Sequence, residues 1–203
     1  MMNPINTYQE SPSFVQDFIN HTISLEGDYV NDEDDRGGET RFGITYHTAK
    51  KYLPYAEDYD WDGDMKTLPI ALAQDIYAYE YYSRPKINLI AEKSELLAKE
   101  VFDSAVNMGA TTPIKFFQRL LNVFNNKQSY YKDIVVDGYL GHNTMSAYSK
   151  LCAKRGDASV ENVFYNALNA MQCVRYIDIA EGNHSQESFV WGWIANRVDY
   201  VPF

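Results

Sequence analysis

The stretch EGDYVNDEDDRGGETRFGIT, residues 26–45, decides the fold expected here, because it joins a helical segment to a dense acidic loop. Before it, apolar side chains recur at near-helical spacing, at Phe14, Phe18, Ile19, Ile23 and Leu25. This spacing predicts a helix over 12–26 that ends at Gly27. The polar, glycine-rich run 28–40 predicts a loop that turns at Gly37-Gly38, with a short hairpin as the alternative.

The first fifteen residues of this stretch carry seven carboxylates: Glu26, Asp28, Asp32, Glu33, Asp34, Asp35 and Glu39. Glycoside hydrolysis requires one protonated carboxyl group as general acid and usually a second, ionised one that activates water or stabilises positive charge. Glu26 is the candidate acid, because partial burial and the negative end of a helix dipole both disfavour its ionised form. A carboxylate in the solvated loop stays ionised and can serve as the second group. Thr40 would orient the attacking water. On composition alone, a solvated acidic loop or a calcium-binding loop remains the alternative.

Helical patterns account for most of the remaining chain. Thr45 is expected to cap a short helix, and Thr67 with Pro69 to begin another that Pro85 stops. Further helices are expected over 92–108, 113–124, 145–154 and 160–180, with a polar connector at 125–133 and a tight turn at 135–144. Asn143 or Thr144 is expected to cap the helix that follows this turn. The predicted fold is mostly α.

Charge and composition exclude several classes of function. The 203-residue chain has a formal net charge of -10, which argues against a nucleic-acid partner and against an electrostatic membrane anchor. It shows neither a signal peptide nor an apolar run of membrane-spanning length, so a start in the cytoplasm without membrane insertion is expected. Scattered histidines predict no metal site, and no cofactor motif is present. Cys152 and Cys173 are expected to be thiols, with a disulfide as the alternative.

Two further segments carry weaker signals. The run DYDWDGD, residues 58–64, copies the first half of a calcium-binding loop, but Pro69 stands where the last acidic ligand should be. Trp191, Trp193 and Tyr200 would stack on sugar rings at the edge of a cleft, or pack in the core.

The order of residues resembles that of glycoside hydrolase family 108, the phage and prophage N-acetylmuramidases whose motif begins Glu-Gly-Gly-Tyr. Here the block reads Glu26-Gly-Asp-Tyr29, so Asp28 stands where the family commonly has its second glycine. Later family segments are resembled, in the same order, by DMKTL (64–68), QDIYAYEYY (74–82), FDSAVNMG (102–109) and FVWGWIANRV (189–198). The region from FFQRLLN (116–122) to VVDGYLGHNTMSAY (135–148) is similar to the peptidoglycan-binding region that follows the family's catalytic part.

This resemblance implies a lysozyme-like α+β fold with a small acidic loop or hairpin and a packed C-terminal helical region. It implies a muramidase region over 1–110 and a peptidoglycan-binding-like region over 111–203. Glu26 takes the place of the catalytic glutamate, with Asp35 as the second carboxylate and Thr40 as the threonine of the wider lysozyme pattern. Asp34 is the alternative, because its spacing to Thr40 is that of phage lysozymes.

Substrate contacts are expected from Tyr29, Asp34, Asp103, Asn107 and Gln118. Asp103 and Asn107 lie four residues apart on one helical face, so they would line the glycan groove or hold neighbouring structure. Gln118 would hydrogen-bond to a sugar, whereas its neighbours Phe117, Leu120 and Leu121 belong in the core.

The predicted reaction is hydrolysis of the β-1,4 bond between N-acetylmuramic acid and N-acetylglucosamine, with inversion if the two carboxyl groups leave room for a water. The expected partner is bacterial peptidoglycan, and the expected state is a monomer. The resemblance implies an endolysin that reaches the wall through a separate phage-encoded pore, with incorporation into the virion as an alternative. The rival functions are a lytic transglycosylase and a non-catalytic wall-binding or virion structural protein.

Overall fold

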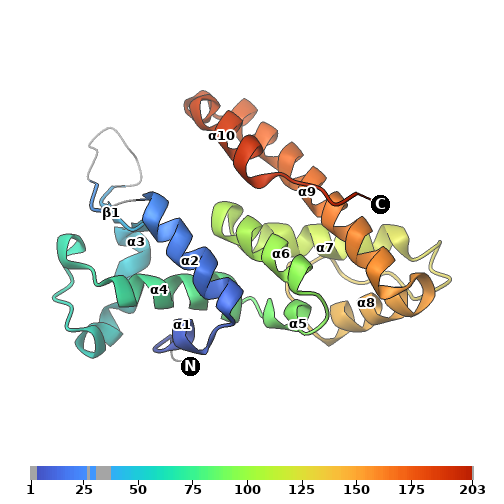
Figure 1. The fold of residues 1–203 in the computed structure, drawn as a ribbon, viewed down its shortest axis with the longest axis horizontal. Helices are drawn as coiled ribbons and strands as arrows, with labels where there is room; N and C mark the ends of the chain where they lie inside the picture. Colours follow the sequence, from blue (N-terminus) through green and yellow to red (C-terminus); the bar gives the residue numbers. More distant parts are fainter. Residues whose placement is uncertain (1–3, 27, 31–37, 203) are drawn as a thin grey trace. The chain divides into compact units, whose positions relative to one another are not determined.

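The computed structural model describes residues 4–26, 28–30 and 38–202 and divides the chain into two compact units, Met1–Arg84 and Pro85–Phe203 (Figure 1). Helices make up most of each unit, and the sheet found in the described ranges is a two-stranded antiparallel hairpin. The predicted mostly α fold with a small hairpin is therefore confirmed. Within the same ranges, no helix combines the length and the apolar character that crossing a membrane requires.

The first unit is built on the packing of α2 against α4. Its elements are α1 (Thr7–Glu10), α2 (Ser13–Glu26), β1 (Thr40–Arg41), β2 (Ile44–Thr45), α3 (Tyr46–Ala49), the 3₁₀ segments η1 (Lys50–Tyr59) and η2 (Met65–Thr67), α4 (Ile70–Ala78) and the π-helical turn η3 (Tyr79–Ser83). Val15, Ile19 and Ile23 lie four residues apart on α2 and are buried, as are Leu72 and Ile76 on α4. Burial of this stripe holds α2 in place up to its last turn.

Asp75, a buried carboxylate on α4, attaches the N-terminal segment to the first unit. Its oxygens accept hydrogen bonds from the backbone N–H groups of Asn6 at 3.1 Å and Tyr8 at 2.7 Å, and from the Tyr59 hydroxyl at 2.6 Å. A buried carboxylate is tolerated where such donors replace water. Burial and the Asp75 carboxylate together raise the pKa of Tyr59 above its usual value.

The second unit is organised around one long helix, α9. Its elements are α5 (Asn88–Ala91), α6 (Glu95–Met108), α7 (Thr111–Phe124), α8 (His142–Arg155), α9 (Asp157–Gly182), the 3₁₀ segment η4 (His184–Gln186) and α10 (Glu187–Arg197). On α9, the ring centroid of Phe164 lies 5.1 Å from that of Phe117, 5.7 Å from Phe124 and 5.8 Å from Tyr148, with the rings edge-on. Edge-to-face contacts add to the stabilisation by burial, so α7, α8 and α9 share one aromatic core.

The start of α8 differs from the prediction. The helix begins at His142 rather than Met145, and its N-cap is Gly141, which offers no side-chain acceptor. The caps predicted at Asn143 or Thr144 are therefore wrong. Thr144 is buried instead, with its hydroxyl 3.4 Å from the side-chain nitrogen of a glutamine on α7. A tertiary contact has taken the place of a local cap.

Trp191, Trp193 and Tyr200, near the C-terminus, are half-buried or exposed. Trp193 of α10 packs against Tyr176 and Phe189, with ring centroids 5.4 Å and 6.3 Å away. Trp191 is 83% exposed and Tyr200 is 71% exposed. Trp193 is half-buried and packs on the Tyr176 and Phe189 rings without belonging to the core, and core packing is wrong for the other two.

Candidate functional site

Glu26 is the last residue of α2, the position predicted for it. The last turn of α2 contains no basic residue, so no cation of this helix offsets the partial negative charge of its C-terminus. The Glu26 side chain lies outside the described part of the structure, and so do Asp34 and Asp35. The separation of the two carboxyl groups, and the choice between Asp34 and Asp35, stay predictions.

An antiparallel bridge joins the two sides of the acidic segment. The N–H of Val30 donates to the Thr40 carbonyl and the N–H of Thr40 donates to the Val30 carbonyl, each at 2.9 Å. Thr40 continues into β1, which pairs with β2 in the register Thr40 to Thr45 and Arg41 to Ile44. The segment between Val30 and Thr40 therefore begins and ends at adjacent points. Thr40, a predicted site residue, lies half-buried at this closure.

The hairpin turns at Phe42-Gly43, where φ is 53° and 75°. Positive φ at both residues suits a two-residue hairpin, because it matches the twist of the strands. Glycine adopts this conformation freely, but phenylalanine needs support. The Tyr77 hydroxyl donates to the Phe42 carbonyl at 3.1 Å, and the Arg41 guanidinium lies 4.9 Å from the Phe42 ring centroid. The sequence predicted a turn at Gly37-Gly38, and the hairpin turn found in the described ranges lies a few residues later, at Phe42-Gly43.

Charged and aromatic side chains brace the hairpin. Arg41 donates from Nε to Oδ1 of Asp28 at 2.8 Å and from Nη1 to the carbonyl of Lys66. Tyr29 donates its hydroxyl to Oε1 of Glu39 at 3.0 Å, and the Lys66 ammonium lies 5.6 Å from its ring centroid. Asp28, the departure from the family motif, is thus the partner of Arg41. Tyr29 is held at both its ring and its hydroxyl, and its role in substrate binding stays a prediction.

Asp103 and Asn107 make contacts within the second unit. Asp103 accepts a hydrogen bond at Oδ1 from Nη1 of Arg197 at 2.7 Å and at Oδ2 from Nε2 of Gln172 at 2.9 Å. Asn107 is exposed and donates to the backbone carbonyl of Asp103 at 2.7 Å. These contacts give both residues a structural role, and their predicted contact with substrate is untested.

Glu100, one turn before Asp103 on α6, was missed by the sequence analysis. It is 6% exposed, and its Oε1 has no hydrogen-bond partner among the residues that the structure describes. Burial, followed by the like charge of Asp103, raises the pKa of Glu100 to about 8. The sequence did contain one indication of its burial, because Glu100 lies on the same helical face as Leu97 and Ser104, which are also buried. Glu100 is therefore largely protonated at neutral pH.

We predict that Glu100→Gln stabilises the protein at pH 8 by on the order of 2 kcal/mol relative to the wild type. Folded Glu100 keeps its proton up to about pH 8, whereas in an unfolded chain the pKa of this carboxyl group is the ordinary value of 4.5. Wild-type stability should therefore fall as pH rises between these two values, and glutamine removes this contribution. Urea denaturation of the full chain at several pH values measures the difference.

The matched control is Glu95→Gln, since Glu95 is exposed on the same helix and pairs with Lys99 at 2.7 Å. That variant should keep the wild-type pH dependence. Parallel stability curves for Glu100→Gln and the wild type would show that Glu100 does not titrate in this range.

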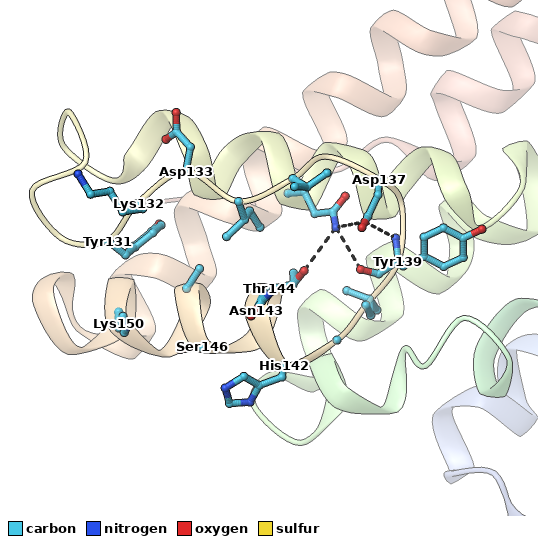
Figure 2. A pocket seen from close by; sticks show the side chains of 16 residues that line it. Tyr131, Lys132, Asp133, Asp137, Tyr139, His142, Asn143, Thr144, Ser146 and Lys150 are labelled. Atoms are coloured by element: carbon cyan, nitrogen blue, oxygen red, sulfur yellow. Dashed lines mark hydrogen bonds between the residues drawn. The ribbon is translucent and has the colours of Figure 1, made fainter.

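A pocket of about 640 Å³ lies in the second unit between the loop after α7 and the first turns of α8 (Figure 2). Gln118 lines it and is 1% exposed. Its Nε2 donates to Oδ1 of Asp137 at 2.8 Å and to the Tyr139 carbonyl at 3.1 Å, and its Oε1 accepts from the Gly138 N–H at 2.8 Å. Internal partners occupy both ends of the amide, so Gln118 holds the loop. Its predicted contact with a sugar is untested.

The weaker candidates have local explanations. In the DYDWDGD run, Asp62 accepts hydrogen bonds from the Asp64 N–H at 3.0 Å and from the Thr67 hydroxyl at 2.5 Å, so its carboxylate stabilises a turn. In the described ranges, no group of three or more metal-ligating side chains comes together. Cys152 on α8 and Cys173 on α9 are free thiols.

Two family models match consecutive parts of the chain. Residues 19–109 match glycosyl hydrolase 108, and residues 112–198 match a predicted peptidoglycan domain. The chain therefore carries a glycosyl hydrolase family 108 domain followed by a predicted peptidoglycan-binding domain. The matches meet near residue 110, whereas the structural units divide between Arg84 and Pro85, so α6 belongs to the first match and to the second unit. The predicted domain boundary remains a prediction.

The fold resembles that of Brucella abortus SagA, with a TM-score of 0.58 and 20% sequence identity. The similarity covers 89% of this chain and 87% of that chain. At this level of identity the likeness concerns the fold. No curated protein matches the sequence at a significant level.

Proposed function

We propose that this protein hydrolyses the β-1,4 bond between N-acetylmuramic acid and N-acetylglucosamine in bacterial peptidoglycan, with Glu26 as general acid. The observation that carries the proposal is the position of Glu26 at the end of α2, within the family 108 match. The bridge between Val30 and Thr40 supports it, because this bridge joins the two sides of the acidic segment soon after the helix ends.

In the proposed reaction, the Glu26 carboxyl group donates its proton to the glycosidic oxygen as the bond from that oxygen to the anomeric carbon breaks. Asp35, or Asp34 in its place, takes a proton from a water that Thr40 orients, and this water forms the new bond to the anomeric carbon. One water is consumed, and each product gains a hydroxyl group. A separation of roughly 6.5 to 9.5 Å between the carboxyl groups accommodates the water and inverts the anomeric centre.

We predict that Glu26→Gln keeps the fold and slows the clearing of purified sacculi by roughly 100-fold to 10,000-fold. An amide of nearly the same shape cannot donate the acid proton. The turbidity of a sacculus suspension measures the rate, and circular dichroism checks the fold. Glu57→Gln is the matched control, because Glu57 is an exposed glutamate on η1 of the same unit.

Clearing by Glu26→Gln at the wild-type rate would remove Glu26 from the mechanism. Mass spectrometry of the wild-type digest separates the rival reactions. Hydrolysis adds water and leaves reducing N-acetylmuramic acid ends, whereas anhydro ends would identify a lytic transglycosylase that uses the substrate's own hydroxyl. Binding of sacculi without clearing by the wild type would identify a non-catalytic wall protein.

The second carboxylate is assigned by a pair of substitutions. We predict that Asp35→Asn lowers the clearing rate by roughly 100-fold, because the attacking water loses its base, and that residual activity persists through Glu26. Asp34→Asn should have a smaller effect. A larger loss in Asp34→Asn would reverse the assignment, and nuclear magnetic resonance of the fresh product reports whether the anomer is inverted.

We further propose that the protein is a phage or prophage endolysin, which acts as a monomer and reaches the wall from the host cytoplasm through a separate membrane pore. The resemblance of the Glu26–Thr40 block to the phage and prophage motif supports this role. Bacteria that express the protein should stay intact until chloroform permeabilises their inner membrane, and their turbidity should then fall. Cells that express Glu26→Gln should stay turbid. Lysis without permeabilisation would contradict release through a separate pore.

A further inference from the structure

The segment 125–141 forms neither helix nor strand, and its part from Tyr131 to Gly141 makes one wall of the pocket of the second unit. Amide side chains of α7 and of the residue after it hold this segment. Asn122 makes two hydrogen bonds with the backbone of Ile134, each 2.9 Å long, and Asn125 donates to Oδ1 of Asp133 at 2.5 Å. Together with Gln118, they attach the loop along its length. The pocket wall is therefore fixed before any ligand arrives, which lowers the entropic cost of binding.

Two lysines line this pocket without a carboxylate partner. Lys132 comes from the loop and Lys150 from α8, both are exposed, and neither forms an ion pair within the part of the chain that the structure describes. Figure 2 shows both lysines toward one end of the pocket, with Tyr139 toward the other.

The Asp133 carboxylate, near the lysine end, is turned away from α8 in the same view. Asp133 and Asp137 also line the pocket, but each carboxylate accepts a hydrogen bond from an amide side chain, Asp133 from Asn125 and Asp137 from Gln118. Among the described residues, the two lysines are therefore the charged groups of this lining that have no partner.

The first turn of α8 adds hydrogen-bond donors to the lining of the pocket. The backbone N–H groups of His142, Asn143 and Thr144 find no acceptor in the described ranges, because Gly141 at the N-cap has no side chain. All three residues line the pocket. Unpaired N–H groups at a helix start carry partial positive charge and favour anionic groups. These N–H groups therefore add to the preference for anionic ligands that Lys132 and Lys150 create.

A carboxylate-bearing peptide fits this chemistry. In peptidoglycan, the short peptide attached to N-acetylmuramic acid carries free carboxylates, whereas the peptide-bearing glycan strand itself is uncharged. A pocket of about 640 Å³ is within the range of sites for small ligands. Tyr139, which is 77% exposed, offers a ring face to the rest of such a ligand.

We propose that this pocket binds the acidic stem peptide of peptidoglycan through Lys132 and Lys150. The second unit then recognises strands that bear peptides rather than bare glycan. This inference rests on the proposed function, since it takes peptidoglycan as the substrate.

Isothermal titration of the full chain with a soluble N-acetylglucosaminyl-N-acetylmuramyl tetrapeptide tests the proposal. This probe contains no bond between N-acetylmuramic acid and a following N-acetylglucosamine, so the proposed reaction does not consume it. We expect Lys132→Gln and Lys150→Gln each to weaken binding by about tenfold, because each removes a charge-assisted contact to carboxylate. Amidation of the probe's carboxylates, or removal of its peptide, should weaken binding at least as much.

Lys154→Gln is the matched control, because Lys154 is an exposed lysine one turn further along α8 and does not line the pocket. It removes the same charge and should leave the affinity unchanged. Equal loss in Lys154→Gln, equal affinity for the peptide-free disaccharide, or no binding at millimolar probe would each overturn the proposal. Failure of the Glu26 assignment would appear in the clearing assay and leave these affinities unchanged, so the two proposals fail separately.

Discussion

Loop backbone in this protein depends on hydrogen bonds with buried and half-buried side chains, because the hairpin found in the described ranges has only two residues per strand. Buried N–H and carbonyl groups must find partners, and irregular segments have no sheet ladder to supply them. Asp75 accepts from the segment around α1, and Gln118 and Asn122 pair with the loop before α8. Asn166 does the same for the C-terminal segment, with two hydrogen bonds of 2.8 Å to Val201.

This constraint places the candidate functional residues. In the first unit, a helix with a buried apolar face ends at Glu26, and a backbone bridge between Val30 and Thr40 joins the chain beyond it. In the second unit, a loop follows α7, and the amide side chains of Gln118 and Asn122 on α7 hold this loop against the helix. Residues that act on ligands commonly lie on loops held by rigid elements, because a loop backbone adopts shapes that helices and strands do not.

Local sequence signals predicted α2 and α7 to within two residues at each end, and they predicted the end of α6 but placed its start three residues too early. α6 begins after Ser94, whose hydroxyl accepts from the Leu97 N–H, and it ends at Gly109, where φ is 79°. The cap predicted at the start of α8 was wrong, because the Thr144 hydroxyl contacts the Gln118 side chain on α7 instead of the backbone of its own helix. The local signals also missed Glu100, since a single carboxylate on an apolar face does not reveal whether it is buried. The proposed catalytic role of Glu26 rests on its place at the end of an apolar helix and on the family-like order of the residues that follow it.

The sequence by itself determined the mostly α class, the course of α2, α6 and α7, and the family of the glycosidase domain, because each follows from residues close together in the chain. Only the tertiary structure decided which polar side chains serve the fold. Gln118 meets Asp137 across 19 residues, and Asp103 meets Arg197 across 94. No local pattern encodes such a partner, because it depends on how helices pack. For the same reason, the pocket between the loop and α8, with its two lysines, emerges from the folded chain and not from any motif.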